Sequence, residues 1–241
     1  MKMPTKRICL WSGPRNISTT LMYSFAQRSD TKVFDEPLYA HYLSRTNARN
    51  YHPGADDILA TMENDGKKVI NMMMGEHKKS VIFFKNMTHH LLDLDRDFMK
   101  NCIHIILTRD PVEMLPSFDK VIKDPNIDDV GYALHTELLG YFENAGIIPI
   151  VIDAKKVLLS PEKMLKQLCD RIGISFDKEM LNWESGARNE DGIWAQYWYS
   201  NIHKSTGFLP YKAKTDPFPE RLKPLLDKCL IHYKKLNSLS L

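Results

Sequence analysis

The chain has 241 residues, of which 43% are hydrophobic and 26% are charged, and its formal net charge is +3. This composition is typical of a globular protein and excludes a disordered chain, and so small a charge gives no support to a general nucleic-acid binder. No apolar run approaches the roughly 18 to 20 residues that a membrane span needs. We therefore expect neither nucleic acid nor a membrane span, and the oligomeric state stays open.

The cysteines and the N-terminus predict a cellular compartment. Cys9 and Cys102 lie in or beside apolar runs, where cysteine is usually a small core residue, and the four cysteines lack the spacing of a metal site. Residues 1–7 carry three positive charges, but the apolar run over residues 8–11 is too short for a signal peptide. We predict a reduced, cytoplasmic protein.

Apolar runs bounded by turn residues predict five strands. They cover residues 7–11, 31–34, 81–84, 102–107 and 147–152. Pro149 indicates either an edge position for the last strand or the first residue of a strand, and argues against the sheet centre. Helices are predicted over residues 19–28, from Pro111 onward, and over residues 161–172 with Gly173 as the stop. The alternation indicates an α/β fold of three layers, a mostly parallel central sheet with helices on both faces.

We expect a single domain over residues 1–241, without an internal repeat. Residues 182–217 hold three of the four tryptophans. We interpret this stretch, called the covering segment below, as a long and partly irregular loop region that packs over the sheet. Its aromatic side chains suit a sugar or lipid, but aromatic core is the more common role of such residues.

The turn after the first strand has the setting of a phosphate-binding loop. Its sequence is Ser12-Gly13-Pro14-Arg15-Asn16-Ile17-Ser18-Thr19-Thr20. It lies between a buried strand and a helix, and helix N-terminal amides bind phosphate. Aligned on Gly13 with G-x-x-x-x-G-K-[ST], it keeps the spacing and the hydroxyl of Thr20, but Thr19 replaces the lysine. Arg15 supplies a cation instead, so the loop suits a 5′-phosphate better than a triphosphate with magnesium. The alternative is an ordinary βα turn.

A second anion site is predicted at the end of the fourth strand. Asp110 is the expected N-cap and Pro111 the first residue of the following helix. Arg109 then lies at the C-terminal edge of the sheet, where open α/β sheets bind ligands. Ser117 comes eight residues later, and an arginine with a hydroxyl can bind one phosphate together. The alternative for Arg109 is a surface ion pair.

These two segments resemble the sulfotransferases that use 3′-phosphoadenosine 5′-phosphosulfate (PAPS). S-G-P-R-N-I-S-T-T-L is similar to the loop of that family, with Asn16-Ile17 where Ser-Gly is usual, and I-L-T-R-D-P-V-E-M-L-P-S-F is similar to its 3′-phosphate segment. The late stretch K-V-L-L-S-P-E-K-M-L-K-Q-L-C-D-R-I-G-I-S-F also resembles a helix of the family. The chain looks closer to a divergent branch sometimes named aminotransferase-like than to the animal cytosolic enzymes of the family. It shows no lysine context for pyridoxal phosphate.

The resemblance implies a P-loop-like sulfotransferase fold, PAPS as co-substrate, no metal, and a small-molecule acceptor with a hydroxyl or amine. It places the 5′-phosphosulfate on the loop and the 3′-phosphate on Arg109 and Ser117. Arg188, in a late loop, is a further candidate for the 3′-phosphate. The implied nucleotide-binding residues are Gly13, Pro14, Arg15, Asn16, Ile17, Ser18, Thr19, Thr20, Arg109, Ser117 and Arg188.

An acceptor hydroxyl loses a proton as it attacks, and two places offer a base. After the third strand, Lys85 is followed by His89 and His90, a loose match to the family's K-T-H segment, in which His is the base and Lys lies near the transferred group. Neighbours on a helix diverge by about 100°, so we expect only one histidine to face the site. The alternative is a pair of surface histidines. After the second strand, Glu36 matches the base of a bacterial branch, and needs a raised pKa to be efficient. Its alternative is an ion pair with Arg15.

Two other functions stay open. One is an unusual P-loop kinase in which Arg15 replaces the lysine, although no strand-end aspartate for magnesium is evident. The other is a nucleotide-binding module without catalysis, which would keep Arg15, Arg109 and Ser117 but have no working base.

Overall fold

The computed structural model describes residues 5–241, so Lys2, one of the N-terminal positive charges, lies outside the described part. Five strands form one parallel sheet in the order β2-β3-β1-β4-β5. Their bounds are β1 (Lys6–Ser12), β2 (Thr31–Asp35), β3 (Val81–Met87), β4 (Ile103–Thr108) and β5 (Ile150–Asp153). The predicted sheet is confirmed, β5 is at an edge as expected, and Pro149 precedes it.

The helices fill the connections between the strands. The α-helices are α1 (Ser18–Ala26), α2 (Tyr39–Arg45), α3 (Ala55–Thr61), α4 (Gly66–Met74), α5 (Pro111–Phe118), α6 (Ile127–Val130), α7 (Tyr132–Asn144), α8 (Ala154–Leu159), α9 (Pro161–Ile172), α10 (Ala195–Trp198) and α11 (Lys223–Ser238). Short 3₁₀ turns are η1 (Asn47–Asn50), η2 (Thr88–His90), η3 (Asp97–Asn101), η4 (Lys178–Leu181), η5 (Ile202–Lys204) and η6 (Glu220–Leu222). Two predicted boundaries are confirmed: Asp110 caps α5 through the Val112 amide, and Gly173 ends α9 with a φ of 74°.

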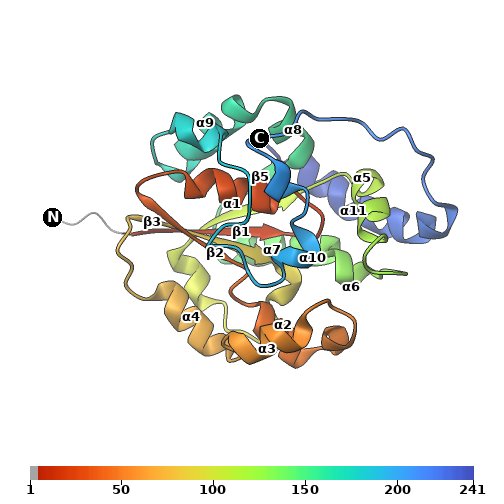
Figure 1. Ribbon diagram of the computed structural model, residues 1–241, viewed down its shortest axis with the longest axis horizontal. Helices are drawn as coiled ribbons and strands as arrows, with labels where there is room; N and C mark the ends of the chain where they lie inside the picture. The colour runs from red at the N-terminus through yellow and green to blue at the C-terminus, as the bar shows by residue number, and fades with distance from the viewer. Residues whose placement is uncertain (1–4) are drawn as a thin grey trace.

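Both faces of the sheet are buried, which gives the three layers (Figure 1). Along β1, Ile8 and Leu10 pack against α1, α8 and α9, whereas Cys9 and Trp11 pack against α4, α7 and α11. Because successive residues of a strand point to opposite faces, an uninterrupted apolar strand is required where both faces are covered. The α/β architecture follows from this pattern.

β3 runs three residues beyond the predicted strand. Lys85, Asn86 and Met87 continue the pairing with β1, and all three are buried. A lysine interrupts the apolar pattern that indicates a strand, so the sequence placed the end too early. The burial of Lys85 is possible because carboxylates neutralise its charge, as described below.

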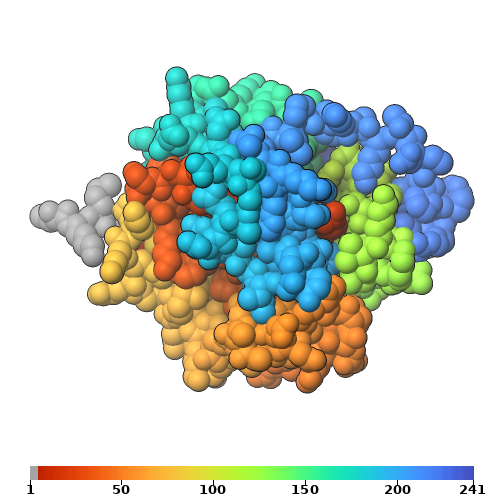
Figure 2. Space-filling view, in the orientation of Figure 1, coloured from red at the N-terminus to blue at the C-terminus, as the bar shows by residue number. Residues whose placement is uncertain are grey.

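The covering segment crosses the edge of the sheet where the strands end. It contains the short helices α10 and η5, and Figure 2 shows it in blue across this face, against the orange α2 and α3. Trp194 and Tyr199 pack into one cluster with Tyr39 of α2 and Ile58 of α3. Within residues 5–241, no helix combines the length and the hydropathy of a membrane span.

Candidate active site

Four neighbouring strands end at the same edge of the sheet, and the candidate residues follow these ends. The loop over residues 13–17 follows β1, Glu36 follows β2, η2 follows β3 and Arg109 follows β4. Because all the strands are parallel, residues far apart in the sequence meet at this edge. The parallel topology therefore assembles one site from four connections.

The loop after β1 is fixed by its own side chains. Asn16 donates from Nδ2 to the Leu107 carbonyl (3.2 Å) and accepts the Ile17 amide at Oδ1 (2.9 Å). Ile17 has φ −90° and ψ 24°, a bridge conformation with negative φ that is open to residues with a side chain, so the position does not need the glycine that is usual in the family. The positive φ of the loop lies at Arg15 (51°) instead.

The first turn of α1 faces the cavity with unpaired amides. Ile17 caps the helix without a side-chain hydrogen bond, so the N–H groups of the first turn have no partner inside the helix. Ser18, Thr19 and Thr20 make up this turn and all line the cavity. Together with the helix dipole, these donors favour an anion.

Gly13 does not line the cavity, but its lack of a side chain lets the backbone of Val130 pack against the loop. A Cβ at this position would lie 2.7 Å from the Val130 carbonyl oxygen. We expect Gly13→Ala to lower the free energy of unfolding by about 1–3 kcal/mol, because backbone would have to move. Gly140→Ala is the matched control: nothing lies within 4 Å of its Cβ inside α7, so it should stabilise by about 0.5–1 kcal/mol. Urea denaturation measures both, and equal values would contradict this role of Gly13.

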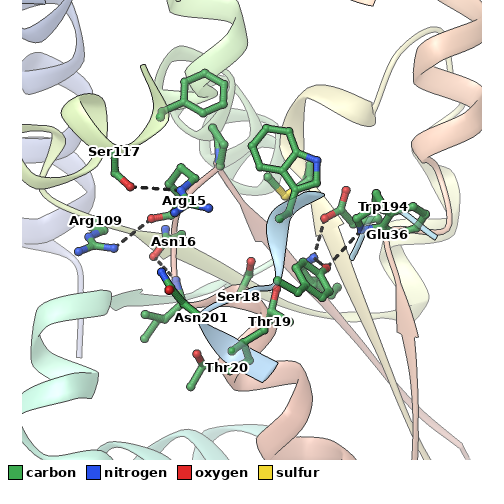
Figure 3. Close-up of a pocket in the computed structure, with 18 of the residues that line it drawn as sticks. Arg15, Asn16, Ser18, Thr19, Thr20, Glu36, Arg109, Ser117, Trp194 and Asn201 are labelled. Atoms are coloured by element: carbon green, nitrogen blue, oxygen red, sulfur yellow. Dashed lines mark hydrogen bonds and ion pairs between the residues drawn. The ribbon is translucent and has the colours of Figure 1, made fainter. Parts of the chain in front are cut away.

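Three cations line the cavity beside the loop, and two of them, Arg15 and Arg109, are labelled in Figure 3. Arg15 donates from Nε to Ser117 Oγ (3.2 Å), and Arg109 donates from an NH group to the Arg15 carbonyl (3.0 Å). Lys214, from the covering segment, donates to the Glu113 carbonyl (2.7 Å). Burial, and then the charge of Arg109, lowers the pKa of Arg15. Like charges held this close favour an anion between them.

Arg109 also forms an ion pair, which was the alternative role considered from the sequence. Its other NH group lies 3.3 Å from Glu113 Oε2, one turn along α5. Its Nε is buried without a hydrogen-bond partner in the described residues. Of the three cations, Arg109 alone has a carboxylate within 4.0 Å among the described residues, so positive charge is in excess at this end of the cavity.

The loop, the cations and the other strand ends line one cavity of about 420 Å³. In Figure 3, Arg15, Arg109 and Ser117 lie on one side, and Glu36 and Trp194 lie on the other. We call the first the phosphate end and the second the acceptor end. Mutual contacts around Glu36 and Trp194 gather the other lining residues of the acceptor end, which are Tyr39, Tyr42, His52, Lys85, His89, His90, Trp198 and Tyr199. Asp129 lies beside them, because its charge acts on His52 and its carboxylate accepts the neighbouring Tyr51 hydroxyl.

Lys85 is the centre of a buried charge network at the acceptor end. Its ammonium donates to Asp35 Oδ1 (2.8 Å), Glu36 Oε1 (2.5 Å) and the Tyr199 hydroxyl (2.6 Å). Burial alone would lower the pKa of Lys85, but the two carboxylates outweigh it and hold the pKa well above its usual value. An ammonium has three donors, so Lys85 has none left for a ligand. The interpretation of Glu36 as a partner of Arg15 is wrong, because Glu36 pairs with Lys85.

Glu36 has the features of a poised carboxylate. It is 8% exposed, and its φ of 41° is unusual for a residue with a side chain. Burial raises the pKa of Glu36, and the neighbouring Lys85 charge only partly offsets this. Oε1 is held by Lys85, and Oε2 lies 4.0 Å from His90 Nδ1. The second oxygen therefore keeps its capacity to accept a proton.

Both histidines of η2 line the cavity, so the expectation that only one faces the site is wrong. The turn is a single 3₁₀ turn at the end of β3, and both rings pack beside Tyr42 instead of one turning to solvent. His90 also stacks on Tyr39, with 4.7 Å between ring centroids. Burial lowers the pKa of His89 to about 3 and that of His90 well below its usual value. Both rings are neutral at pH 7.

Arg188 does not line this cavity. Its guanidinium lies over the Tyr23 ring, 5.0 Å from the centroid, and Nε is 3.7 Å from Glu190 Oε2. The Asp191 carboxylate fixes this turn by accepting the Arg188 amide and the Tyr23 hydroxyl. The covering segment brings Lys214 to the phosphate end in its place.

The chain matches the model of a family described as "Sulfotransferase domain" over residues 6–239. Two proteins of Arabidopsis thaliana, branched-chain-amino-acid aminotransferase-like proteins 2 and 1, are 41% and 40% identical to it over 228 and 230 residues. These alignments cover 94% and 95% of this chain, but the chain spans only about two fifths of the length of those relatives.

Solved structures share the fold at low sequence identity. A sulfotransferase domain from the curacin biosynthetic pathway has a TM-score of 0.55 at 16% identity, with 95% of this chain and 98% of that chain covered. A sulfotransferase from Alicyclobacillus acidocaldarius has a TM-score of 0.57 at 12% identity, with 100% of this chain and 98% of that chain covered. The architecture predicted from the sequence is thus the one found in sulfotransferase structures.

Proposed function

Because the chain belongs to the sulfotransferase-domain family, we propose that it moves a sulfuryl group from PAPS to a hydroxyl or amine of a small molecule. One observation carries the proposal: the uncapped start of α1, a group of three cations and a buried carboxylate line the same cavity. A nucleotide phosphorylated at both ends suits the phosphate end. A base at the acceptor end suits an attacking hydroxyl.

The loop and Arg15 hold the 5′-phosphosulfate in this proposal, and Arg109 and Ser117 hold the 3′-phosphate. Lys214 adds a third cation, and two of its three donors have no partner in the described residues. Arg15, assigned to the 5′-phosphosulfate, donates a hydrogen bond to Ser117, assigned to the 3′-phosphate, so the two proposed phosphate sites adjoin. A sulfuryl group carries less negative charge than a phosphoryl group, so the proposed reaction requires neither a lysine at position 19 nor a magnesium ion.

Glu36 is the proposed base, ahead of His89 and His90. A group with a pKa near 3 is a weak base at neutral pH, and this applies to His89. The raised pKa and the free Oε2 of Glu36 suit proton removal. The acceptor oxygen forms a bond to sulfur, the bond from sulfur to the 5′-phosphate oxygen breaks, and the acceptor proton moves to Glu36. The leaving bisphosphate takes the electron pair, and the loop amides and Arg15 stabilise its charge.

Arg109→Ala tests the assignment of the 3′-phosphate. Losing a charged hydrogen-bond donor should weaken adenosine 3′,5′-bisphosphate by about 10- to 100-fold and leave adenosine 5′-phosphate within about threefold. Calorimetric titration measures both ligands. Lys120→Ala is the matched control, because Lys120 is an exposed cation near the same end that does not line the cavity. Equal losses for the two nucleotides would refute the assignment.

A further inference from the structure

The acceptor end differs from the phosphate end in charge. The phosphate end holds Arg15, Arg109 and Lys214 against the single carboxylate of Glu113. At the acceptor end, Lys85 is outnumbered by its two carboxylate partners, Asp35 and Glu36. With Lys85 fully engaged, no lysine or arginine donor remains at the acceptor end in the described residues.

Asp129 adds a second negative charge to this end. It lines the cavity from α6, and no lysine or arginine of residues 5–241 lies within 4.0 Å of its carboxylate. Oδ1 accepts the Tyr51 hydroxyl (3.2 Å), and Oδ2 accepts the Asn126 amide (2.9 Å). An ionised carboxylate has about four acceptor sites, so Asp129 keeps the capacity to bind a ligand donor.

The histidines at the acceptor end are neutral, so they do not offset the negative charge of the carboxylates. Their ring nitrogens can form hydrogen bonds with a ligand. His89 and His90 are 7% and 1% exposed, and Nδ1 of each has no hydrogen-bond partner among residues 5–241. Burial lowers the pKa of His52, at the same end, to about 4, so its ring is also neutral at pH 7. Neutral imidazoles with unpaired buried nitrogens indicate a polar partner, such as a hydroxyl, that the cavity receives.

From these observations we infer that the acceptor is a small, positively charged hydroxyl compound with an aromatic or apolar body, its ammonium group held by Asp129. This inference rests on the proposed function. Trp194 and Trp198 line the same end, and aromatic faces attract cations. An acceptor with a carboxylate or phosphate would meet Glu36 and Asp129 with no free cation to neutralise it.

Three phenols that differ mainly in charge test the inference: tyramine, 4-ethylphenol and 3-(4-hydroxyphenyl)propionate. We expect kcat/KM with PAPS to be about tenfold higher for tyramine than for 4-ethylphenol, and lowest for the propionate. Asp129→Asn should lower the value for tyramine about tenfold and leave 4-ethylphenol within about twofold. Asp128→Asn is the matched control, since it removes a charge from the same helix turn outside the cavity lining and should change none of the three.

Calorimetric binding of the three phenols to the enzyme with adenosine 3′,5′-bisphosphate reads the same selectivity without turnover. If Asp129→Asn does not fold, the order of the three affinities measured on the wild-type protein still tests the inference. The inference is overturned if the bisphosphate binds but the phenols show no preference for tyramine, a preference for the propionate, or no binding at all. Each of these results leaves the proposed function in place. Failure of the bisphosphate itself to bind overturns the proposed function.

Discussion

Glu36→Gln is expected to lower the rate of sulfuryl transfer by about 10²- to 10⁴-fold, the usual contribution of a general base. The amide keeps the shape of the side chain but cannot take the acceptor proton. Because the phosphate end is untouched, the affinity for adenosine 3′,5′-bisphosphate should stay within about threefold. Single-turnover rates with labelled PAPS and calorimetry measure the two quantities.

Asp35→Asn is the matched control for this substitution. Asp35 is the other carboxylate on Lys85 and is not among the residues that line the cavity, so its loss removes the same charge without removing the base. We expect the rate of Asp35→Asn to stay within about tenfold of wild type. If both variants lose the rate equally, the effect comes from Lys85 and Glu36 is not the base.

The pH profile separates Glu36 from the histidines. With the pKa of Glu36 raised by burial, the rate should rise with pH through a value above the usual 4.3 or so, as the carboxylate loses its proton. With His89 as base, a pKa of about 3 would leave the rate flat from pH 5 upward. Loss of the acid limb in Glu36→Gln is the predicted result, and its persistence would point to another group.

Lys85→Met is expected to lower the free energy of unfolding by about 3–5 kcal/mol, since it leaves Asp35 and Glu36 buried without their cation. Without the Lys85 charge, burial would raise the pKa of Glu36 further above its unfolded value, so the variant should lose more stability than the wild type as pH rises. Urea denaturation at several pH values measures this. If the variant does not fold, adding Asp35→Asn and Glu36→Gln should restore most of the stability, because no buried charge remains.

Lys166→Met is the matched control on the surface. Lys166 pairs with Glu162 one turn away on α9, and both side chains are about half exposed. Exposed pairs of this kind contribute about 0.3–0.5 kcal/mol. A loss in Lys85→Met no larger than in Lys166→Met would show that the buried network does not stabilise the fold.

The sheet was predictable because its strands are continuous apolar runs. Strand alternation explains both covered faces, and local signals placed Pro111 at the start of α5 and Gly173 at the end of α9. These features depend on neighbours in the sequence. The end of β3 was misplaced for the opposite reason: Lys85 is compatible with a buried strand only through partners that local pattern does not reveal.

The site was predictable in part. The loop residues, Arg109, Ser117 and Glu36 follow strand ends, and parallel topology brings such ends together. Lys214 and Tyr199 come from the covering segment. Each lies more than 100 residues from its partner, the Glu113 carbonyl for Lys214 and the Lys85 ammonium for Tyr199, and no periodicity marks their position. Asp129 was missed because it also caps α6, an ordinary structural role.

The affinity for adenosine 3′,5′-bisphosphate, compared with that for ATP and magnesium, tests the account most directly. Calorimetric titration of the wild-type protein measures both. Under the proposed function, the loop with Arg15 and the pair of Arg109 and Ser117 each hold one phosphate group, and position 19 carries a threonine in place of lysine. The bisphosphate is therefore expected to bind in preference to the triphosphate. Tight binding of ATP with magnesium and none of the bisphosphate would contradict the account and favour a kinase.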